Sequence, residues 1–388
     1  MKILIAHDTF YPNVDGASYF TQRLAKGLVK RGHEVLVIAP GQKFKSHYGN
    51  LDDLKVYWVF SIPVMVANYR FSLPYLHETT IEKAVAEFDP EVVHLQGHFP
   101  INSGVLKAAK KLGKPTVGTN HFMPDNLAHY FLAEKYLRRP FEKIAWSGFR
   151  KTFSQLDAVT TPTQTAADLL AKIGFDKEVQ PVSCGIDLNK FAIEKSTAGV
   201  KEKYNIKDKF TALYVGRLDK DKSIDVIIRA LPKVLEKNDM QLIIAGKGKE
   251  SENLKKLAKK LRVSENVVFP GFVSDDELPN FYNIADCAIS PGNFELQSIS
   301  TMEAMATGLP IIAVRAVALP ELVHEGENGF LFEPGHSEEV ADYLLRLIED
   351  EDLRKNMGQR SLEIIKNHDI DKSLETFEEI YREAIVKH

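Results

Sequence analysis

Short apolar runs alternate with amphipathic segments in the first half of the chain. Short, mainly apolar runs of four to six residues predict strands at 2–6, 34–39, 56–60, 92–95, 116–119 and 158–161. Residues 19–31 instead place Phe20, Leu24 and Leu28 at helical spacing, and Gly32 follows as a stop signal. Alternating strands and helices predict a parallel sheet that is covered by helices on both faces.

The same alternation restarts near Phe210. Strands are predicted at 211–215, 241–245, 267–269, 287–290 and 310–313, and helices at 223–236 and 252–261. The polar stretch 194–199 reads as a linker. We therefore expect an α/β protein with two Rossmann-like, doubly wound domains, at residues 1–195 and 200–368, facing a central cleft. Residues 370–388 form a last helix that packs on the second domain or returns to the first.

Composition narrows the class of protein. The chain has 388 residues, 44% of them hydrophobic, and two cysteines outside any metal-binding pattern. A net charge of −3 gives no positive field for nucleic acid. The first apolar run is too short for a signal peptide, and no stretch approaches the roughly 20 apolar residues of a membrane span. We expect a cytoplasmic protein, either soluble or peripheral at the inner face of the membrane.

Three strand-to-helix loops carry candidate chemistry, because ligands of doubly wound folds bind at the carboxyl ends of the strands. Gly16 lies in the first such loop, where backbone N–H groups can approach a phosphate; a plain turn is the alternative. Arg217 and Lys222 share the first loop of the second domain, and two cations there can clamp a diphosphate. The alternative for this pair is solvated surface charge.

The third loop leads into a helix and carries two acids, Glu295 and Glu303, eight positions apart. One lies in the loop and the other two turns into the helix, so they are expected to reach different parts of one extended ligand. Carboxylates accept hydrogen bonds from sugar and ribose hydroxyls, and the helix start between them offers N–H groups to a phosphate. The alternative is an ordinary pair of helical acids.

These loops together resemble a known family. The E-x7-E spacing, the loop G-R-L-x-x-x-K at 216–222 and the segment PIIAVRAVALPELVHEGENGFLF at 310–332 are similar to retaining nucleotide-sugar glycosyltransferases of the GT-B fold. The turn 183–187 (SCGID) is similar to the family's S-N-G-I-D, with Cys184 in place of Asn. The resemblance runs along nearly the whole chain and is most specific in its second half.

The resemblance implies roles for individual residues. Glu295 contacts the transferred sugar and Glu303 the ribose, while Arg217 and Lys222 hold the diphosphate. His121 lies over the donor sugar beside the acceptor, whereas His94 reads as structural. The other implied donor-binding residues are Gly16, Val273 and the backbone of Gln297, Ser298 and Ile299; the family often has Gly where Ser298 stands.

No metal or other cofactor is expected. The cations and the helix start can stabilise the leaving diphosphate, and Asp52-Asp53 and Asp275-Asp276 lack the D-x-D spacing. The family implies retention by front-face attack. Three rivals remain: a nucleotide-sugar epimerase, a non-catalytic sensor of nucleotide sugars, and an NAD enzyme. The last would need a G-x-G-x-x-G loop, which the chain lacks.

Two locally basic stretches bear on the identity of the acceptor. Residues 132–151 carry six Lys/Arg, two Glu and several large apolar residues, and residues 105–114 add four lysines. Basic amphipathic stretches of this kind suit anionic membranes, and the stretch also resembles glycolipid synthases that glycosylate diacylglycerol. We predict that Arg138, Arg139, Lys143 and Trp146 contact the membrane, with Phe149 inserting beside Trp146. An ordinary helix with a basic face, acting on a soluble sugar or polysaccharide precursor, is the alternative.

Overall fold

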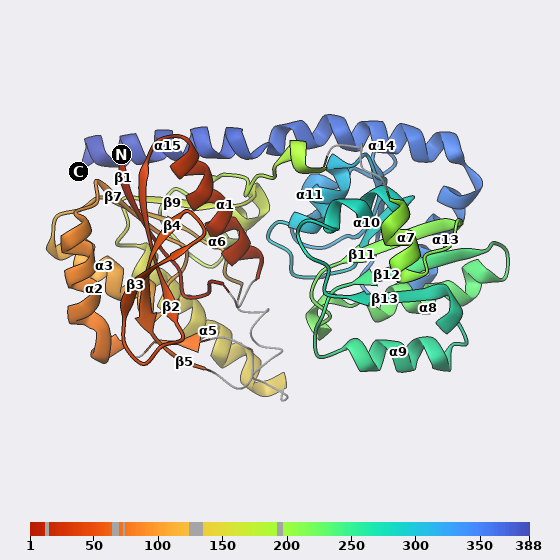
Figure 1. Ribbon diagram of the computed structural model, residues 1–388, viewed down its shortest axis with the longest axis horizontal. Coiled ribbons are helices and arrows are strands. Elements are labelled where there is room, and N and C mark those ends of the chain that lie inside the picture. Colours follow the sequence, from red (N-terminus) through yellow and green to blue (C-terminus); the bar gives the residue numbers. More distant parts are fainter. Residues whose placement is uncertain (12–14, 64–69, 73, 124–134, 192–196) are drawn as a thin grey trace. The chain divides into compact units, whose positions relative to one another are not determined.

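The chain forms two compact units. The structure, a computed structural model, describes residues 1–11, 15–63, 70–72, 74–123, 135–191 and 197–388. Unit 1 comprises Met1–Gly185 together with Asp371–His388, and unit 2 comprises Ile186–Ile370 (Figure 1). The boundary thus precedes the polar stretch that the sequence suggested as a linker, and the last helix belongs to unit 1.

Unit 1 is built on an eight-stranded sheet in the order β10-β9-β8-β7-β1-β2-β4-β3. All neighbouring strands are parallel except the hairpin of β3 and β4. The sequence missed β3, because His47–Leu51 is mostly polar and has no apolar run. The strands are β1 (Lys2–Ala6), β2 (Glu34–Gly41), β3 (His47–Leu51), β4 (Leu54–Phe60), β7 (Val92–Leu95), β8 (Thr116–Thr119), β9 (Ala158–Thr161) and β10 (Gln180–Pro181), beside a separate pair of β5 (Ile62–Pro63) and β6 (Arg70–Phe71).

The first helix begins earlier than the apolar pattern predicted. Asp15 and Ser18 form a capping box, in which Ser18 N donates to Asp15 Oδ1 (2.8 Å) and Asp15 N donates to Ser18 Oγ (2.7 Å). These bonds start the helix at Gly16, before its first buried apolar residue. The helices of unit 1 are α1 (Gly16–Lys30), α2 (Pro74–Phe88), α3 (Pro100–Lys111), α5 (Lys135–Phe153), α6 (Gln164–Lys172) and α15 (Ile370–Lys387).

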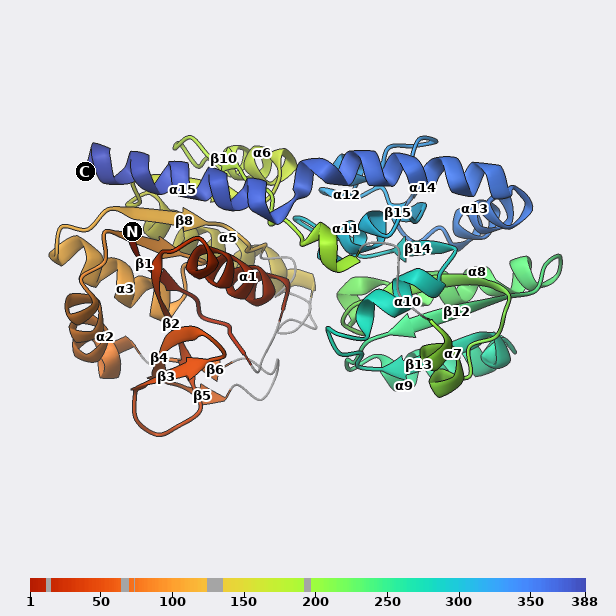
Figure 2. The same ribbon diagram turned by 45° about the horizontal axis from the view of Figure 1, so that its top comes forward.

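Helix α15 returns to the first unit and packs beside α1 (Figures 1 and 2). Leu374, Phe377 and Ile380 lie at helical spacing and are buried. Glu378, 8% exposed in its side chain, receives hydrogen bonds from Arg31 (2.7 Å) and from the ring of His33 (2.9 Å). The Arg31 hydrogen bond, with burial opposing it, lowers the pKa of Glu378 to about 2. Both apolar packing and this ionic contact therefore fix α15 to unit 1.

Unit 2 is built on a six-stranded parallel sheet in the order β13-β12-β11-β14-β15-β16. The order reverses at β11, which lies between β12 and β14, so the loops after β11 and β14 open on one crevice. In unit 1 the order reverses at β1, between β2 and β7. The strands of unit 2 are β11 (Phe210–Val215), β12 (Met240–Ala245), β13 (Val267–Gly271), β14 (Cys287–Ser290), β15 (Ile311–Val314) and β16 (Gly329–Phe332).

The helices of unit 2 cover its sheet and bury their apolar faces, as in the amphipathic α8. They are α7 (Ala198–Tyr204), α8 (Asp225–Leu235), α9 (Ser251–Lys260), α10 (Leu278–Ile284), α11 (Ile299–Ala306), α12 (Leu319–Leu322), α13 (Ser337–Glu349) and α14 (Glu351–Ile365), with 3-10 turns η1 (Leu188–Phe191), η2 (Lys220–Lys222), η3 (Ser264–Asn266) and η4 (Lys366–His368).

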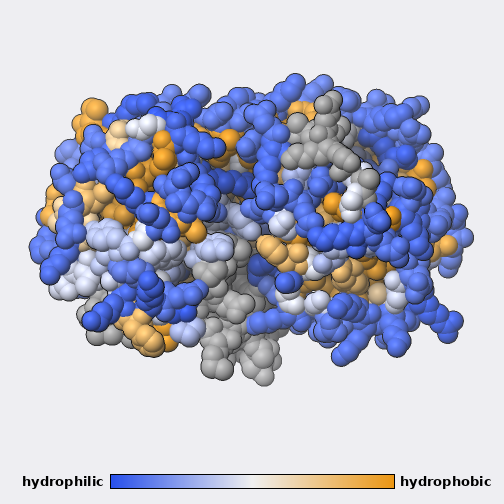
Figure 3. Space-filling model, in the orientation of Figure 1, coloured by the Kyte–Doolittle hydropathy of each residue, from blue (hydrophilic) through white to orange (hydrophobic). Residues whose placement is uncertain are grey.

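The surface reflects this burial. The face drawn in Figure 3 is mainly hydrophilic, with apolar residues in small patches. Within the described part of the chain, every helix is too short or too polar to cross a membrane.

Candidate functional site

The loop after β11 is held in place by the loop after β12. Leu218 N donates to Lys247 O (2.9 Å), and Glu250 N donates to Leu218 O (2.8 Å). Gly246 has φ +150°, and a Cβ there would lie 1.8 Å from Gly216 O. Only glycine permits this approach. The backbone that carries Arg217 and Lys222 is therefore fixed before any ligand binds.

Two acids of the same loop hold Arg217. Its guanidinium forms an ion pair with Asp219 and donates from Nη2 to Asp221 Oδ2 (3.3 Å). Asp221 is 5% exposed, and its Oδ1 has no hydrogen-bond partner among the described residues. Neither acid was among the predicted site residues, although both are visible in the sequence two and four positions after Arg217.

Lys222 brings the two predicted parts of the site together. Its Nζ donates to Glu295 Oε1 at 2.5 Å, although 73 positions separate the residues, and lies 3.8 Å from Asp221 Oδ2. The two side chains are 20% and 21% exposed, so both remain accessible. Gly292 makes room, because a Cβ there would lie 2.9 Å from Glu295 Oε1. Lys222 of the loop after β11 and Glu295 of the loop after β14 thus meet where the strand order of the sheet reverses.

Helix α11 begins directly after this acid. Ser298 is its N-cap, and its Oγ accepts from Thr301 N (3.3 Å) and Thr301 Oγ1 (2.8 Å). Serine therefore fits at this position, where the family often has glycine, because its hydroxyl caps the helix. The first N–H groups of a helix have no partner within it, so an anion bound by the backbone from Gln297 to Ile299 stays a prediction.

Glu303 makes contacts different from those of Glu295. It is 5% exposed, and Tyr282, a residue that the sequence analysis missed, donates its hydroxyl to Glu303 Oε2 (3.0 Å). Val273, which the resemblance implies as a donor-binding residue, is 8% exposed. Its side chain belongs to the core, so its backbone is the part left for a ligand.

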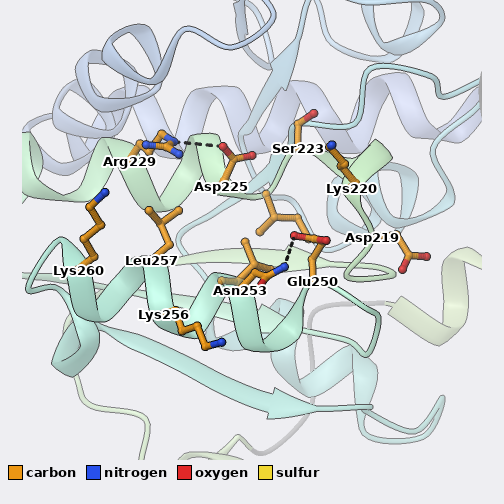
Figure 4. Close-up of a pocket in the computed structure, with 12 residues that line it drawn as sticks. Asp219, Lys220, Ser223, Asp225, Arg229, Glu250, Asn253, Lys256, Leu257 and Lys260 are labelled. Carbon is orange, nitrogen blue, oxygen red and sulfur yellow. Dashed lines mark hydrogen bonds and ion pairs between the residues drawn. The ribbon is translucent and has the colours of Figure 1, made fainter. Parts of the chain in front are cut away.

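A pocket of unit 2 lies between the loop after β11 and helix α9. It measures about 420 Å³, and η2, α8 and α9 line it (Figure 4). Its lining is charged, with Arg229, Lys256 and Lys260 beside Asp225 and Glu250, and Arg229 Nε donates to Asp225 Oδ2 (3.1 Å). None of the residues that the sequence assigned to the donor lines this pocket.

In unit 1, the predicted residues lie at the carboxyl ends of the strands. Gly16 is the first residue of α1, with open space around its Cα. His121 follows β8, contacts the ring of Phe20 (5.0 Å) and bonds through Nε2 to Gln96 Oε1 (2.8 Å). Burial, and then the nearby His7 and His94, hold the pKa of His121 well below its usual value.

Asp8 at the end of β1 is a further acid that the sequence analysis missed. Its carboxylate accepts from Ile101 N (2.8 Å) and from the side chain of Asn102, and so caps α3, whose own N-cap Phe99 has no side-chain oxygen. Burial raises the pKa of Asp8 to about 6, although these hydrogen bonds oppose the shift.

The structure corrects the aromatic part of the membrane prediction. Phe149 is 0% exposed and stacks on Phe153, and Trp146 packs against Phe122, Phe149 and the core of unit 1. The prediction that Phe149 inserts into a bilayer is therefore wrong. Trp146 is half-buried. Ile144 is 72% exposed and Lys143 is exposed. Arg138 and Arg139 lie in α5, but their side chains are outside the described part.

The structure also corrects the prediction that residues 105–114 carry a net positive charge. All four lysines of 105–114 pair with acids that lie elsewhere in the sequence, which cancels the positive charge counted for that stretch. The pairs are Lys107–Glu78 (2.8 Å), Lys110–Asp157 (3.9 Å), Lys111–Glu82 (2.5 Å) and Lys114–Asp89 (2.6 Å).

Comparisons with known proteins agree with this arrangement. The model of the family "Glycosyl transferases group 1" matches residues 198–363, and that of "Glycosyltransferase Family 4" matches 14–190. An alpha-monoglucosyldiacylglycerol synthase of Streptococcus pneumoniae is 25% identical, over 100% of this chain and 87% of its own length. A GDP-mannose-dependent alpha-mannosyltransferase of Corynebacterium glutamicum is 24% identical, over 95% and 85%.

A solved structure shows the same fold. Anabaena HepE, determined in complex with UDP and glucose, superposes with a TM-score of 0.80 at 20% identity, covering 98% of this chain and 99% of its own. Two parallel-sheet domains and two matching family models define a glycosyltransferase of the GT-B fold. This chain is such a glycosyltransferase, and its second half, residues 198–363, is the part that matches the group 1 family.

Proposed function

We propose that the protein transfers a hexose, with retention of configuration, from a nucleoside-diphosphate sugar such as a UDP-sugar or GDP-mannose to an acceptor hydroxyl. The contact between Lys222 and Glu295 carries this proposal, because it joins a cation for the diphosphate to an acid for the sugar hydroxyls. The relatives named for glucosyl and mannosyl transfer support it.

In this reaction the acceptor oxygen attacks the anomeric carbon on the face that the diphosphate leaves. The bond from carbon to diphosphate oxygen breaks, and the acceptor proton passes to the departing diphosphate. Arg217, Lys222 and the start of α11 stabilise the negative charge that develops there. Glu295 stabilises the positive charge on the sugar.

The first experiment identifies donor and outcome together. Thermal shifts with UDP-glucose, UDP-galactose, UDP-N-acetylglucosamine and GDP-mannose select the donor, since a bound ligand stabilises the folded state. Transfer with that donor, followed by NMR of the anomeric proton of the product, tests retention. Isomerisation of the donor without transfer would instead favour a nucleotide-sugar epimerase.

Turnover is expected to survive removal of divalent metal. Two cations and a helix start supply the positive charge that a metal ion provides in other transferases. The rate is measured in EDTA and again after addition of excess Mg²⁺ or Mn²⁺. Loss of activity in EDTA that either ion restores would refute the metal-independent reaction.

We also propose a membrane lipid such as diacylglycerol as the acceptor, reached from the inner face of the membrane. Phe99, 37% exposed, contacts Phe122 (5.5 Å between ring centres), and Phe122 contacts Trp146 (6.0 Å). Phe122 directly follows His121 in the chain. This partly exposed aromatic row lies beside a candidate site residue of unit 1, and a relative is named an alpha-monoglucosyldiacylglycerol synthase.

The protein is expected to sediment with anionic vesicles at low salt but not with neutral ones. Each basic residue near an anionic surface contributes about 1 kcal/mol, so reversing Arg138, Arg139 and Lys143 to Glu should abolish binding. Salt should do the same, since the screening length falls from about 10 Å at 0.1 M to about 3 Å at 1 M.

The matched control is Lys107→Glu, because Lys107 is already paired with Glu78. It should leave vesicle binding unchanged. Absence of binding at low salt, together with transfer to a soluble sugar, would assign the protein to soluble acceptors or polysaccharide precursors.

A further inference from the structure

Gln96, just after β7, connects two histidines of unit 1. Its side chain is buried, with 2% exposure. Its Oε1 lies 2.8 Å from His121 Nε2, while its Nε2 lies 3.2 Å from Nε2 and 3.3 Å from Nδ1 of His94. The amide thus touches the candidate site residue on one side and a fully buried ring on the other.

The ring of His94 is fixed at both nitrogens. Its Nδ1 lies 2.7 Å from the hydroxyl of Tyr381 on α15, and its Nε2 lies 2.7 Å from Thr119 Oγ1 on β8. Burial lowers the pKa of His94 to about 3, so the ring is neutral at physiological pH. The two hydroxyls therefore occupy both in-plane hydrogen-bonding positions of this ring.

The His94 ring determines which way the Gln96 amide points. The amide nitrogen is almost equally far from both ring nitrogens, so it faces the ring instead of pointing at one lone pair. An N–H group is attracted to the negative face of an aromatic ring, whereas a carbonyl oxygen is repelled by it. The orientation with nitrogen at His94 and oxygen at His121 is therefore favoured.

This orientation fixes the proton on His121. Burial and the neighbouring His7 and His94 keep the ring neutral, so it carries one N–H. Because Gln96 Oε1 can only accept, that N–H is on Nε2. The other nitrogen, Nδ1, then has a lone pair and is an acceptor.

We propose that Gln96 is a positioning residue that holds His121 as the Nε2–H tautomer, so that Nδ1 accepts a hydrogen bond from a hydroxyl of the bound sugar. The tautomer follows from the contacts within unit 1. The sugar hydroxyl as the partner of Nδ1 rests on the proposed function. Helix α15 contributes through Tyr381, which orients His94.

The test is a long-range ¹H–¹⁵N correlation spectrum of the full chain labelled with ¹⁵N-histidine. The His121→Gln variant assigns the His121 signals among the 12 histidines. Wild type should show Nε2 protonated and Nδ1 bare. Gln96→Ala should move His121 toward the other tautomer, and Gln96→Glu should give an imidazolium, because a carboxylate stabilises the cation.

The matched control is Gln155→Glu, which adds the same charge at an exposed position of unit 1 and should leave the His121 signals unchanged. Protonation of Nδ1 in the wild type, or an unchanged tautomer in Gln96→Ala, would overturn the inference.

Kinetics test the partner of Nδ1. Loss of one neutral hydrogen bond should lower kcat of Gln96→Ala about tenfold, with the affinity for the free nucleotide unchanged. A wild-type rate despite an altered tautomer would overturn the sugar contact. An inactive wild type with the expected tautomer would count against the proposed function, whereas an active wild type with the other tautomer would count against this inference.

Discussion

Glu295→Gln is expected to lower the turnover number about 100-fold or more and to leave nucleoside-diphosphate affinity unchanged or improved. A charged group that stabilises the transition state is typically worth a factor of this size. In the free protein Glu295 also holds Lys222 at 2.5 Å, so neutralising it releases this cation for the diphosphate. Steady-state rates give kcat, and calorimetry with UDP or GDP gives the affinity.

The second acid provides the contrast. Glu303→Gln should weaken free nucleotide binding about tenfold or more, because a hydrogen bond to a charged group contributes roughly 1.5–3 kcal/mol. Glu349→Gln, at the exposed end of α13, should change neither quantity. If Glu295→Gln lost the nucleotide and Glu303→Gln lost only turnover, the two assignments would have to be exchanged.

The fold was predictable because its strands are buried on both faces. Such strands are continuous apolar runs, for example 240–245 in β12, where every residue is buried. The hairpin strand β3 was not predictable in this way, since its side chains alternate between exposed and half-buried positions. The predicted start of helix α1 lay too far along the sequence, because the Asp15–Ser18 capping box sets this start and an apolar residue does not.

The candidate site was predictable where it is local in sequence and not where it depends on tertiary contacts. Arg217 and Lys222 could be paired because they share one loop. The contact of Lys222 with Glu295, the Tyr282 hydroxyl on Glu303 and the amide of Gln96 come from distant segments. Strand order brings these residues together, and periodicity does not reveal that order.

The same limit explains the membrane correction. Phe149 and the four lysines of α3 and its end looked like a membrane-binding surface when counted along the chain. The fold instead buries Phe149 in the core and sets acids opposite the lysines. A linear count of charge and aromatic residues cannot separate a surface from a packed or neutralised face.

Arg217→Ala is expected to weaken nucleoside-diphosphate binding at least about tenfold. The lost interaction is a charged hydrogen bond of roughly 1.5–3 kcal/mol, and each 1.4 kcal/mol corresponds to about a tenfold change in affinity. The guanidinium is 36% exposed in its side chain, so a phosphate can reach it although Asp219 and Asp221 hold it. Calorimetric titration with UDP and GDP measures the change.

Two further variants test whether diphosphate binding depends on Arg217 itself. Arg217→Lys keeps a charge beside the buried Asp221 but loses the planar guanidinium, which can bind a phosphate through two N–H groups. Compared with Arg217→Ala, it should therefore recover folding stability to a greater extent than affinity for the nucleoside diphosphate. Arg229→Ala removes an arginine of the same unit that lines the pocket of Figure 4 and pairs with Asp225. It should leave affinity unchanged. If Arg229→Ala abolished binding and Arg217→Ala did not, the nucleotide would occupy the pocket between α8 and α9 instead of the crevice after β11 and β14.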